Sequence, residues 1–343
     1  MTSDYFEVSV AEEIGRVWIG KPHVVLLGAG ASKAALPTGD RHGRSVPLLR
    51  EVAQELDLDR LFPPNLSDIA RNDFEGAYSQ LFERGEETVK EINNRVADYF
   101  GKLDLPEEPN LYDVLILSLR NKDAIFTFNW DPFLMQSRTR LARLGVPSLP
   151  KMFFLHGNVT IGFCDNDRVS GVNGKQCSKC GELFTPSRLL FPVENKNYTD
   201  GGFIQREWEA VRLYLKEAFM LTFFGYSAPT TDVEAVKLLK EGWGNVTDRN
   251  MEQTEIINRP GSDHNALERT WQPFIHTHHR EILDSFYDSW LANHPRRSGE
   301  AHWNQYYEAR FVSRNPVPQK AAGLKELVDW FKPLLEAELR PDT

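Results

Sequence analysis

A glycine turn and two polar strand ends are the residues of this sequence that could carry chemistry. Residues 23–27 form a short apolar run followed by Gly28 and Gly30, and such a run is typical of a buried parallel strand. Glycines at such a turn leave room for a ligand phosphate, and the amides of a following helix attract an anion. The third glycine of a dinucleotide-binding motif is absent, because Lys33 stands there. A tight strand-to-helix turn without a ligand therefore stays open as an alternative.

Two further buried strands are predicted at 124–128 and 152–155, and polar residues follow both. The first ends in Asn129 and Asp131, and the second ends in His156. Because open parallel sheets bind ligands at the carboxyl ends of their strands, these side chains are candidate site residues. A carboxamide can hold a water molecule or a ribose hydroxyl, and an imidazole can accept a proton near neutral pH. For His156 alone a structural role is the simpler interpretation, and its two polar neighbours favour a site.

The elements around these residues indicate an α/β fold with a Rossmann-like parallel sheet and helices on both faces. Apolar residues at helical spacing predict helices, and two more strands are predicted between them. The predicted helices cover 8–19, 111–119, 133–144, 208–218 and 232–240, and the predicted strands cover 219–224 and 253–257. We expect a catalytic domain over 1–260, which carries a helical insertion at 46–105 and a cysteine-containing insertion at 157–192. A helical C-terminal extension over 261–343 is expected to follow.

All three cysteines of the chain lie in the second insertion. Cys177 and Cys180 have the spacing of one half of a zinc knuckle, and Cys164 with Asp167 would form the other half. A carboxylate then replaces the fourth thiolate. Three thiolates and a carboxylate are chemically able to hold zinc, but a degenerate module without metal fits the sequence equally well. We expect zinc to be bound weakly or not at all.

The composition is that of a globular protein and excludes several classes. The 343 residues carry a net charge of −9, which argues against a general nucleic-acid-binding surface. No apolar run approaches the length of a membrane span, and the first residues lack the basic and apolar regions of a signal peptide. The few cysteines form no disulfide framework. We therefore expect a cytoplasmic protein that binds neither membranes nor nucleic acid directly.

Taken in order, these motifs resemble the sirtuin superfamily, and in particular its sirtuin-like branch of bacterial NAD-consuming defence proteins. The resemblance covers about 20–260 as separate islands. Gly28-Ala29-Gly30-Ala31-Ser32 is similar to the sirtuin phosphate loop, Thr127-Phe128-Asn129-Trp130-Asp131 to the motif on the nicotinamide side, and Leu155-His156-Gly157 to the catalytic-histidine motif. Gly225-Tyr226-Ser227 and Ile257-Asn258 are similar to the two motifs near the adenosine ribose, and the cysteines to the zinc module.

The resemblance implies an enzyme that takes NAD as its substrate. It implies Asn129 and His156 as the catalytic residues. It also implies a set of cofactor-binding residues from the same motifs: Gly28, Ala29, Gly30, Ala31, Ser32, Thr127, Asp131, Gly225, Ser227 and Asn258.

Two departures from the deacylating sirtuins concern the acceptor of the reaction. Those enzymes carry an Asp-Phe-Arg segment after the glycine loop, whereas Pro37 here leads into Thr38-Gly39-Asp40. They also carry Phe-Gly-Glu after the zinc module, whereas this chain has Leu190-Phe191-Pro192-Val193-Glu194. Residues 225–232 are closer to the defence branch. A docking strand for an acyl-lysine peptide is therefore in doubt, and water is the remaining acceptor.

The expected function is NAD glycohydrolysis, which releases nicotinamide and ADP-ribose. The defence branch further implies an effector that depletes NAD in anti-phage defence by abortive infection. An NAD-dependent protein deacylase or ADP-ribosyltransferase, and a catalytically silent nucleotide-sensing scaffold, stay open as alternatives. The helical insertion and the C-terminal extension are expected to carry homo-oligomer contacts, contacts with a partner defence protein that triggers activity, or both.

Overall fold

A six-stranded, all-parallel sheet forms the centre of the molecule. The computed structural model describes residues 6–85, 87–191, 193, 198, 202–228 and 232–340. The strand order is β10-β9-β8-β2-β3-β4. The strands are β2 (His23–Leu27), β3 (Ala124–Thr127), β4 (Lys151–Phe154), β8 (Met220–Phe224), β9 (Gln253–Ile257) and β10 (Arg280–Leu283). Read from β4 and counted along the chain, this is the doubly wound order 3-2-1-4-5-6. The predicted α/β class is confirmed.

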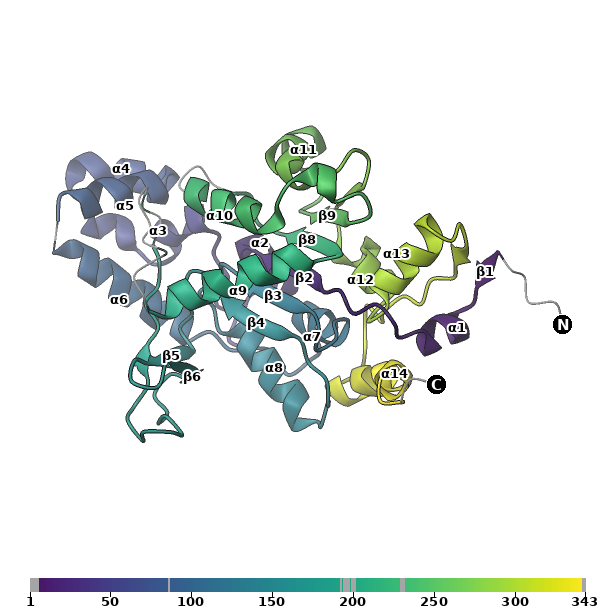
Figure 1. Ribbon diagram of the computed structural model, residues 1–343. Helices are drawn as coiled ribbons and strands as arrows, with labels where there is room; N and C mark the ends of the chain where they lie inside the picture. The colour runs from purple at the N-terminus through teal and green to yellow at the C-terminus, as the bar shows by residue number, and fades with distance from the viewer. Residues whose placement is uncertain are drawn as a thin grey trace.

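Helices cover both faces of this sheet (Figure 1). Because parallel strands are joined by right-handed crossovers, the direction in which the chain moves across the sheet decides which face each helix covers. α7 and α8 pack together on one face, and α9 and α10 pack together on the other. The helices of this layer structure are α2 (Ala29–Ala35), α7 (Leu111–Leu117), α8 (Phe133–Arg143), α9 (Phe203–Glu217), α10 (Val233–Trp243) and α11 (His264–Trp271).

The central strands are almost continuously apolar because both of their faces are covered. In β2 the residues from Val24 to Leu27 are fully buried. β2 pairs with β3 on one side and with β8 on the other, so it has no free edge. The strand that leads into the glycine turn is therefore held on both sides by its neighbours in the sheet.

The predicted helical insertion at 46–105 is present and lies at the left of Figure 1. It contains α3 (Val52–Glu55), α4 (Pro64–Asn72), α5 (Phe74–Glu83) and α6 (Thr88–Gly101), together with two 3-10 helices at Leu49–Glu51 and Leu58–Leu61. Its buried apolar residues belong to the same core as the sheet, so the insertion packs against the sheet domain.

The cysteine-containing insertion forms a small antiparallel sheet of its own, with the order β6-β5-β7. Its strands are β5 (Ile161–Cys164), β6 (Val169–Val172) and β7 (Thr185–Pro186). In Figure 1 the β5 and β6 strands lie below α6. The insertion was predicted to end at position 192, which lies outside the described residues.

The two ends of the chain differ from the sequence-based expectation. The helix predicted over 8–19 is present only in part: the chain forms β1 (Glu7–Val8) and a short α1 (Val10–Gly15), and then continues without a helix. A capping box between Ser9 and Glu12 starts α1. Beyond α1, the amides of Trp18 and Ile19 donate to Glu300 instead of to a helix carbonyl.

The segment after 260 is mainly helical, as predicted, but it also supplies strands. β10 completes the main sheet, and β11 (Phe311–Val312) pairs in parallel with β1. The helices are α12 (Trp290–Asn293), α13 (Ser298–Tyr306) and α14 (Leu324–Ala337), and they lie with α1 at the right of Figure 1. Within the described ranges, no helix combines the length and apolar character that crossing a membrane requires.

Candidate functional site at the carboxyl edge of the sheet

The strand order reverses direction between β2 and β8, and the turns after these two strands contact each other. The amide of Gly28 donates to Phe224 O at 3.0 Å, and the amide of Gly30 donates to Gly225 O at 3.0 Å. In open α/β sheets the crevice outside the carboxyl ends of the strands at such a reversal is where ligands bind. The glycine turn predicted to bind a dinucleotide therefore lies at the position where this fold offers a binding crevice.

Backbone contact between the two turns explains why glycines are required. A Cβ atom on Gly28 would lie 2.5 Å from Gly225 O, and a Cβ on Gly30 would lie 2.8 Å from Gly225 Cα. Gly225 has a φ of +64°, which also favours glycine. The amides of Gly28 and Gly30 are used in this contact. The amide of Ala29 donates to no backbone carbonyl among the described residues, so it is a candidate donor for an anion.

Asn129 ties the end of β3 to the glycine turn. Its Nδ2 group donates to Gly28 O and to Ser32 Oγ, each at 2.9 Å. Its own amide donates to Thr127 Oγ1 at 3.0 Å, which fixes the backbone directly after the strand. Nδ2 makes all the hydrogen bonds between this side chain and the described residues. Oδ1 is therefore the atom of Asn129 that can accept a hydrogen bond from a ligand or water.

Ser32 is the centre of a buried network that includes two of the predicted site residues. Its hydroxyl donates to Asp131 Oδ2 at 2.6 Å, and Tyr112 OH lies 2.6 Å from the same Oγ. Burial raises the pKa of Asp131 to about 6, although the hydrogen bonds from Ser32 and from the Phe133 amide oppose this shift. Burial also raises the pKa of Tyr112, so this phenol keeps its proton. The structure thus brings together Gly28, Ser32, Asn129 and Asp131, as the sequence predicted.

Asn158 supports the same turn from its other side. Its Nδ2 group donates to the carbonyl of Asp131 at 2.6 Å and to that of Asn129 at 3.3 Å. The amide of Val159 donates to Trp130 O at 3.1 Å. The turn that carries the two candidate residues is therefore held at three consecutive carbonyls.

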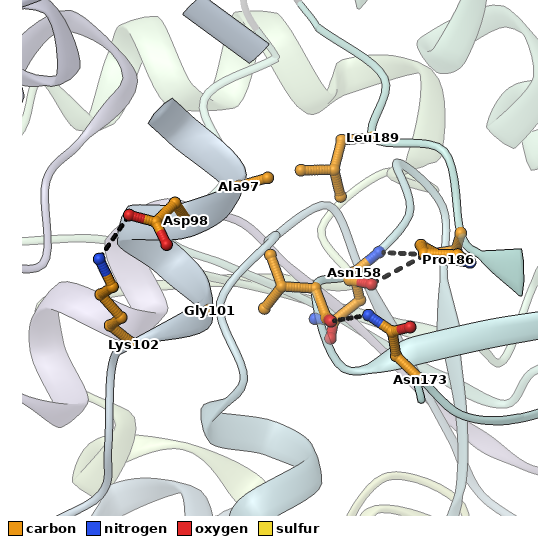
Figure 2. A pocket seen from close by; sticks show the side chains of 10 residues that line it. Ala97, Asp98, Gly101, Lys102, Asn158, Asn173, Pro186 and Leu189 are labelled. Atoms are coloured by element: carbon orange, nitrogen blue, oxygen red, sulfur yellow. Dashed lines mark hydrogen bonds and ion pairs between the residues drawn. The ribbon is translucent and has the colours of Figure 1, made fainter. Parts of the chain in front are cut away.

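A cavity of about 370 Å³ opens on the outer side of Asn158 (Figure 2). One wall is α6, and the other wall comes from the small module and the segment after it. The lining residues are Ala97, Asp98, Gly101, Lys102, Asn158, Val159, Asn173, Pro186, Ser187 and Leu189. A second cavity of about 500 Å³ shares Ala97, Ser187 and Leu189 with the first, and extends it toward α5. A cleft thus runs between the helical insertion and the module, with Asn158 in its wall.

His156 follows β4 and lies among aromatic rings. Its Nε2 is 3.3 Å from Tyr198 OH, and its ring meets the edge of Phe128 with centroids 4.8 Å apart. Phe128 is stacked against Tyr226 at a centroid distance of 4.1 Å. His156 and Asn129 therefore follow neighbouring strands, as predicted. The Asn129 side chain joins the hydrogen-bonded network around Ser32, whereas the His156 ring lies in an aromatic cluster that includes Phe128.

Helix α9 holds the backbone that carries His156. Glu207 accepts a hydrogen bond from the amide of Phe154 at 2.6 Å, and Trp208 Nε1 donates to Leu155 O at 3.0 Å. Burial raises the pKa of Glu207 to about 8. Two consecutive helix residues thus fix the two residues before the histidine.

The predicted residues on the adenosine side lie at the carboxyl ends of β8 and β9. Ser227 is exposed, and Asn258 is half-buried, with its Oδ1 accepting from the amide of Arg259 at 2.8 Å. Gly225 N donates to Ile257 O at 2.9 Å, so the two turns are adjacent. The motif that was compared over 225–232 includes Pro229, Thr230 and Thr231, which lie outside the described residues.

The cysteine module has the donor geometry of a metal site. The ligand atoms of Cys164, Asp167, Cys177 and Cys180 all lie within 4.8 Å of one another. Sγ of Cys164 is 3.5 Å from Sγ of Cys180, and Sγ of Cys177 is 3.2 Å from the Asp167 carboxylate. Tetrahedral zinc with Zn–S bonds of about 2.3 Å places its ligands about 3.3–3.8 Å apart. These four residues would hold zinc in a structural role, and the expectation that zinc is unlikely is not supported.

Several residues around the site were not found from the sequence. Tyr112 belongs to the apolar pattern of the helix predicted at 111–119, and nothing in that pattern marks it as a site residue. Glu207, Trp208 and Tyr198 come from a different part of the chain, and no local pattern marks them. Asn158 could have been found, because it is a polar residue two positions after a strand-end histidine.

No protein-family model matches the chain, and no curated protein matches it. Three solved structures of Sir2 proteins are similar to it. A Sir2 enzyme has 14% identity, covers 84% of this chain and 96% of its own, and gives a TM-score of 0.42. A Sir2 protein bound to acetylated peptide has 15% identity, 84% and 93% coverage, and a TM-score of 0.38. A complex of a Sir2 homologue with NAD has 15% identity, 85% and 90% coverage, and a TM-score of 0.35. At these low values the function has to be argued from the residues themselves.

Proposed function

We propose that this protein is an NAD glycohydrolase, which cleaves the bond between nicotinamide and ribose and releases nicotinamide and ADP-ribose. The observation that carries the proposal is the pair of hydrogen bonds from Asn129 to Gly28 and Ser32. These bonds join the end of β3, which carries the amide proposed to hold the attacking water, to the glycine turn after β2. This turn lies where the strand order reverses. The motif resemblance to the sirtuin-like branch adds NAD as the ligand of this crevice.

The reaction passes through a state with oxocarbenium character, so it needs a positioned water and a proton acceptor. Asn129 Oδ1 accepts a hydrogen bond from the water that attacks the anomeric carbon. His156 accepts the proton from that water or from a ribose hydroxyl. The Asp131 carboxylate accepts from the nicotinamide carboxamide, and the Ala29 amide donates to the pyrophosphate. Ser227 and Asn258 bond the adenosine ribose.

Water is proposed as the acceptor because of the position of Phe191. This residue belongs to the segment Leu190-Phe191-Pro192-Val193-Glu194, which replaces the Phe-Gly-Glu of deacylating sirtuins. Its ring is buried, with centroids 5.1 Å from Tyr78 and 4.8 Å from Trp130. It therefore packs into the core with the helical insertion. Pro192 and Glu194 of the same segment lie outside the described residues.

In the cell, this activity would make the protein an NAD-depleting effector of anti-phage defence. Such an effector has to be silent until it is triggered. The helical insertion and the segment after 260 are proposed as the contacts for self-association or for a triggering partner, because both lie outside the cofactor motifs. A cytoplasmic location is proposed, since NAD is the substrate.

A single assay tests the reaction. The purified full chain is incubated with NAD, with and without an acylated lysine peptide, and free nicotinamide and ADP-ribose are measured by chromatography. Release of both products without peptide is expected. Nicotinamide release only with peptide would identify a deacylase, and no release in the presence of NAD binding would identify a silent sensor. The assay is repeated with the triggering partner added, and again at high protein concentration where the protein is assembled. These repeats control for a resting state of the protein that is inactive.

A further inference from the structure

Tyr112 lies next to the candidate site without belonging to any of its motifs. It sits in the first turn of α7, its side chain is 1% exposed, and its OH is 2.6 Å from Ser32 Oγ and 3.4 Å from Asn129 Nδ2. A buried phenol needs a hydrogen-bond partner, but it does not need one inside a catalytic network. The hydroxyl of Tyr112 therefore lies within reach of Ser32 and Asn129, two of the candidate site residues.

The start of α7 holds Tyr112 rigidly. Asn110 caps the helix and accepts from the Tyr112 amide at 2.8 Å, while its own amide donates to Asp113. Asp113 is fully buried, accepts from Ser137 Oγ at 2.5 Å and forms an ion pair with Arg140. The phenol therefore projects from a turn that is fixed on both sides.

The direction of each hydrogen bond follows from counting protons. Ser32 has one proton, and an ionised Asp131 can only accept, so Ser32 donates to Asp131. Ser32 Oγ then accepts from Tyr112 OH and from Asn129 Nδ2, which fills both of its lone pairs. Tyr112 is the donor because its phenol stays protonated. The chain of donation runs from Tyr112 through Ser32 to Asp131.

We propose that Tyr112 is a positioning residue: its hydroxyl donates to Ser32, keeps Asp131 as an acceptor, and holds the Asn129 carboxamide with Oδ1 toward the crevice. The catalytic part of this inference rests on the proposed function. The network itself does not, because it predicts an energetic coupling between Tyr112 and Asp131 that is present without substrate. Such a chain of donors is stronger than its separate bonds.

The test is the substitution Tyr112→Phe, which removes only the hydroxyl. In the NAD assay we expect kcat to fall by about tenfold with KM nearly unchanged, because orientation of Asn129 matters in the transition state. The matched control is Tyr99→Phe, since the Tyr99 hydroxyl donates to Ser45 O at 2.8 Å in the helical insertion. This control is expected to keep the parent kcat. A Tyr112→Phe enzyme with the parent kcat would overturn the positioning role.

A second measurement needs no activity. The free energy of unfolding is measured for the parent, Tyr112→Phe, Asp131→Asn and the double variant at pH 5 and pH 8. The titratable side chain that faces Asp131 is Tyr112 from α7. We expect Tyr112→Phe to lower the free energy of unfolding more at pH 8, where Asp131 is charged, than at pH 5. This pH dependence should vanish in the Asp131→Asn background. An equal loss of unfolding free energy at both pH values would overturn the proposed network. Coupling without any NAD hydrolysis by the parent would uphold the network and refute the proposed function.

Discussion

Asn129 Nδ2 and Gly28 O are 2.9 Å apart, so the candidate catalytic amide is also a structural brace of the glycine turn. The same group bonds Ser32. A substitution at Asn129 therefore acts on two properties at once, and an experiment has to separate them.

The first prediction concerns the two proposed catalytic residues. Asn129→Ala and His156→Ala should each lower nicotinamide release from NAD by about two orders of magnitude or more, the usual scale for a lost orienting or acid–base group. Asn129→Ala should also lower the free energy of unfolding by about 1–2 kcal/mol, because Gly28 O loses a donor in a buried site. Initial rates and circular dichroism on the same samples measure both effects.

Controls for these two variants come from exposed side chains of the same types. Asn72→Ala changes the end of α4, and His278→Ala changes the turn before β10. Both should keep the parent rate. Folded Asn129→Ala and His156→Ala proteins that turn over NAD at the parent rate would refute the assignment.

The second prediction concerns pH. The folded-state pKa of Asp131 is about 6, above its ordinary value of 3.8, so the folded protein binds this proton more tightly than the unfolded chain. The stability that this group provides is present at low pH and is lost as pH rises from about 4 to about 6. Asp131→Asn should therefore match the parent near pH 4 and exceed its free energy of unfolding by up to about 3 kcal/mol at pH 7.

Chemical denaturation at several pH values measures this difference. Comparing variant with parent at each pH is necessary because Glu207 and Glu255, both with pKa raised to about 8 by burial, titrate in neighbouring ranges. A difference that stays constant from pH 4 to pH 7 would show that Asp131 remains charged throughout.

The third prediction concerns zinc. Protein purified without chelators should contain about one equivalent of zinc, because three thiolates and Asp167 are already at ligand spacing. Cys177→Ser should lose the metal and expose the module to proteolysis between β5 and β7, while the main sheet stays folded. Elemental analysis and limited proteolysis measure this. Metal-free protein with a protease-resistant module would mean that hydrogen bonds among the thiols and Asp167 suffice.

The fourth prediction concerns the contact between the glycine turns. Gly28→Ala places a methyl group 2.5 Å from Gly225 O, and this backbone cannot move without shifting β8. We expect a loss of about 1–3 kcal/mol in the free energy of unfolding, together with weaker NAD binding. Gly20→Ala is the control, because its Cβ would meet nothing within 4 Å. Thermal unfolding with and without NAD compares the two, and equal melting temperatures would show that the turn adapts.

The fifth prediction concerns assembly. If the helical insertion and the segment after 260 carry contacts between copies, native mass spectrometry at micromolar concentration should detect a homo-oligomer. Replacing exposed apolar residues of the insertion, such as Ile69 or Phe82, with Ser should dissociate it. Monomer alone, with and without the cognate partner, would refute self-assembly.

Much of the fold could be predicted because buried parallel strands leave a clear pattern. The strand at 23–27 was predicted with its observed bounds, since both faces of this sheet are covered and its apolar run ends at Gly28. β10 was missed because an edge strand that begins Arg280-Glu281 is only half-buried and lacks that pattern. The helix predicted over 8–19 ends early, at Gly15, because Trp18 and Ile19 bond to Glu300, which lies about 280 positions away.

Only part of the candidate site could be predicted from the sequence. Strand ends of a parallel sheet meet at one edge, so Asn129, Asp131 and Ser32 could be brought together from the sequence. Tyr112 could not, because nothing local distinguishes a phenol that faces Ser32 from one that fills the core. The contacts of Glu207 and Trp208 with the backbone before His156 depend on how α9 crosses the sheet, and spacing along the chain does not encode this.

The contact between Gly30 and Gly225 has a consequence for synthesis on the ribosome. Its two sides are about 195 positions apart, so β2 emerges long before β8, its neighbour in the sheet. At about 5–20 residues per second, the apolar β2 edge waits roughly 10–40 s for this partner. No nascent chain shorter than about 225 residues can form the contact between these two turns. Until β8 has been made, the unpaired β2 edge is therefore where a chaperone would be needed.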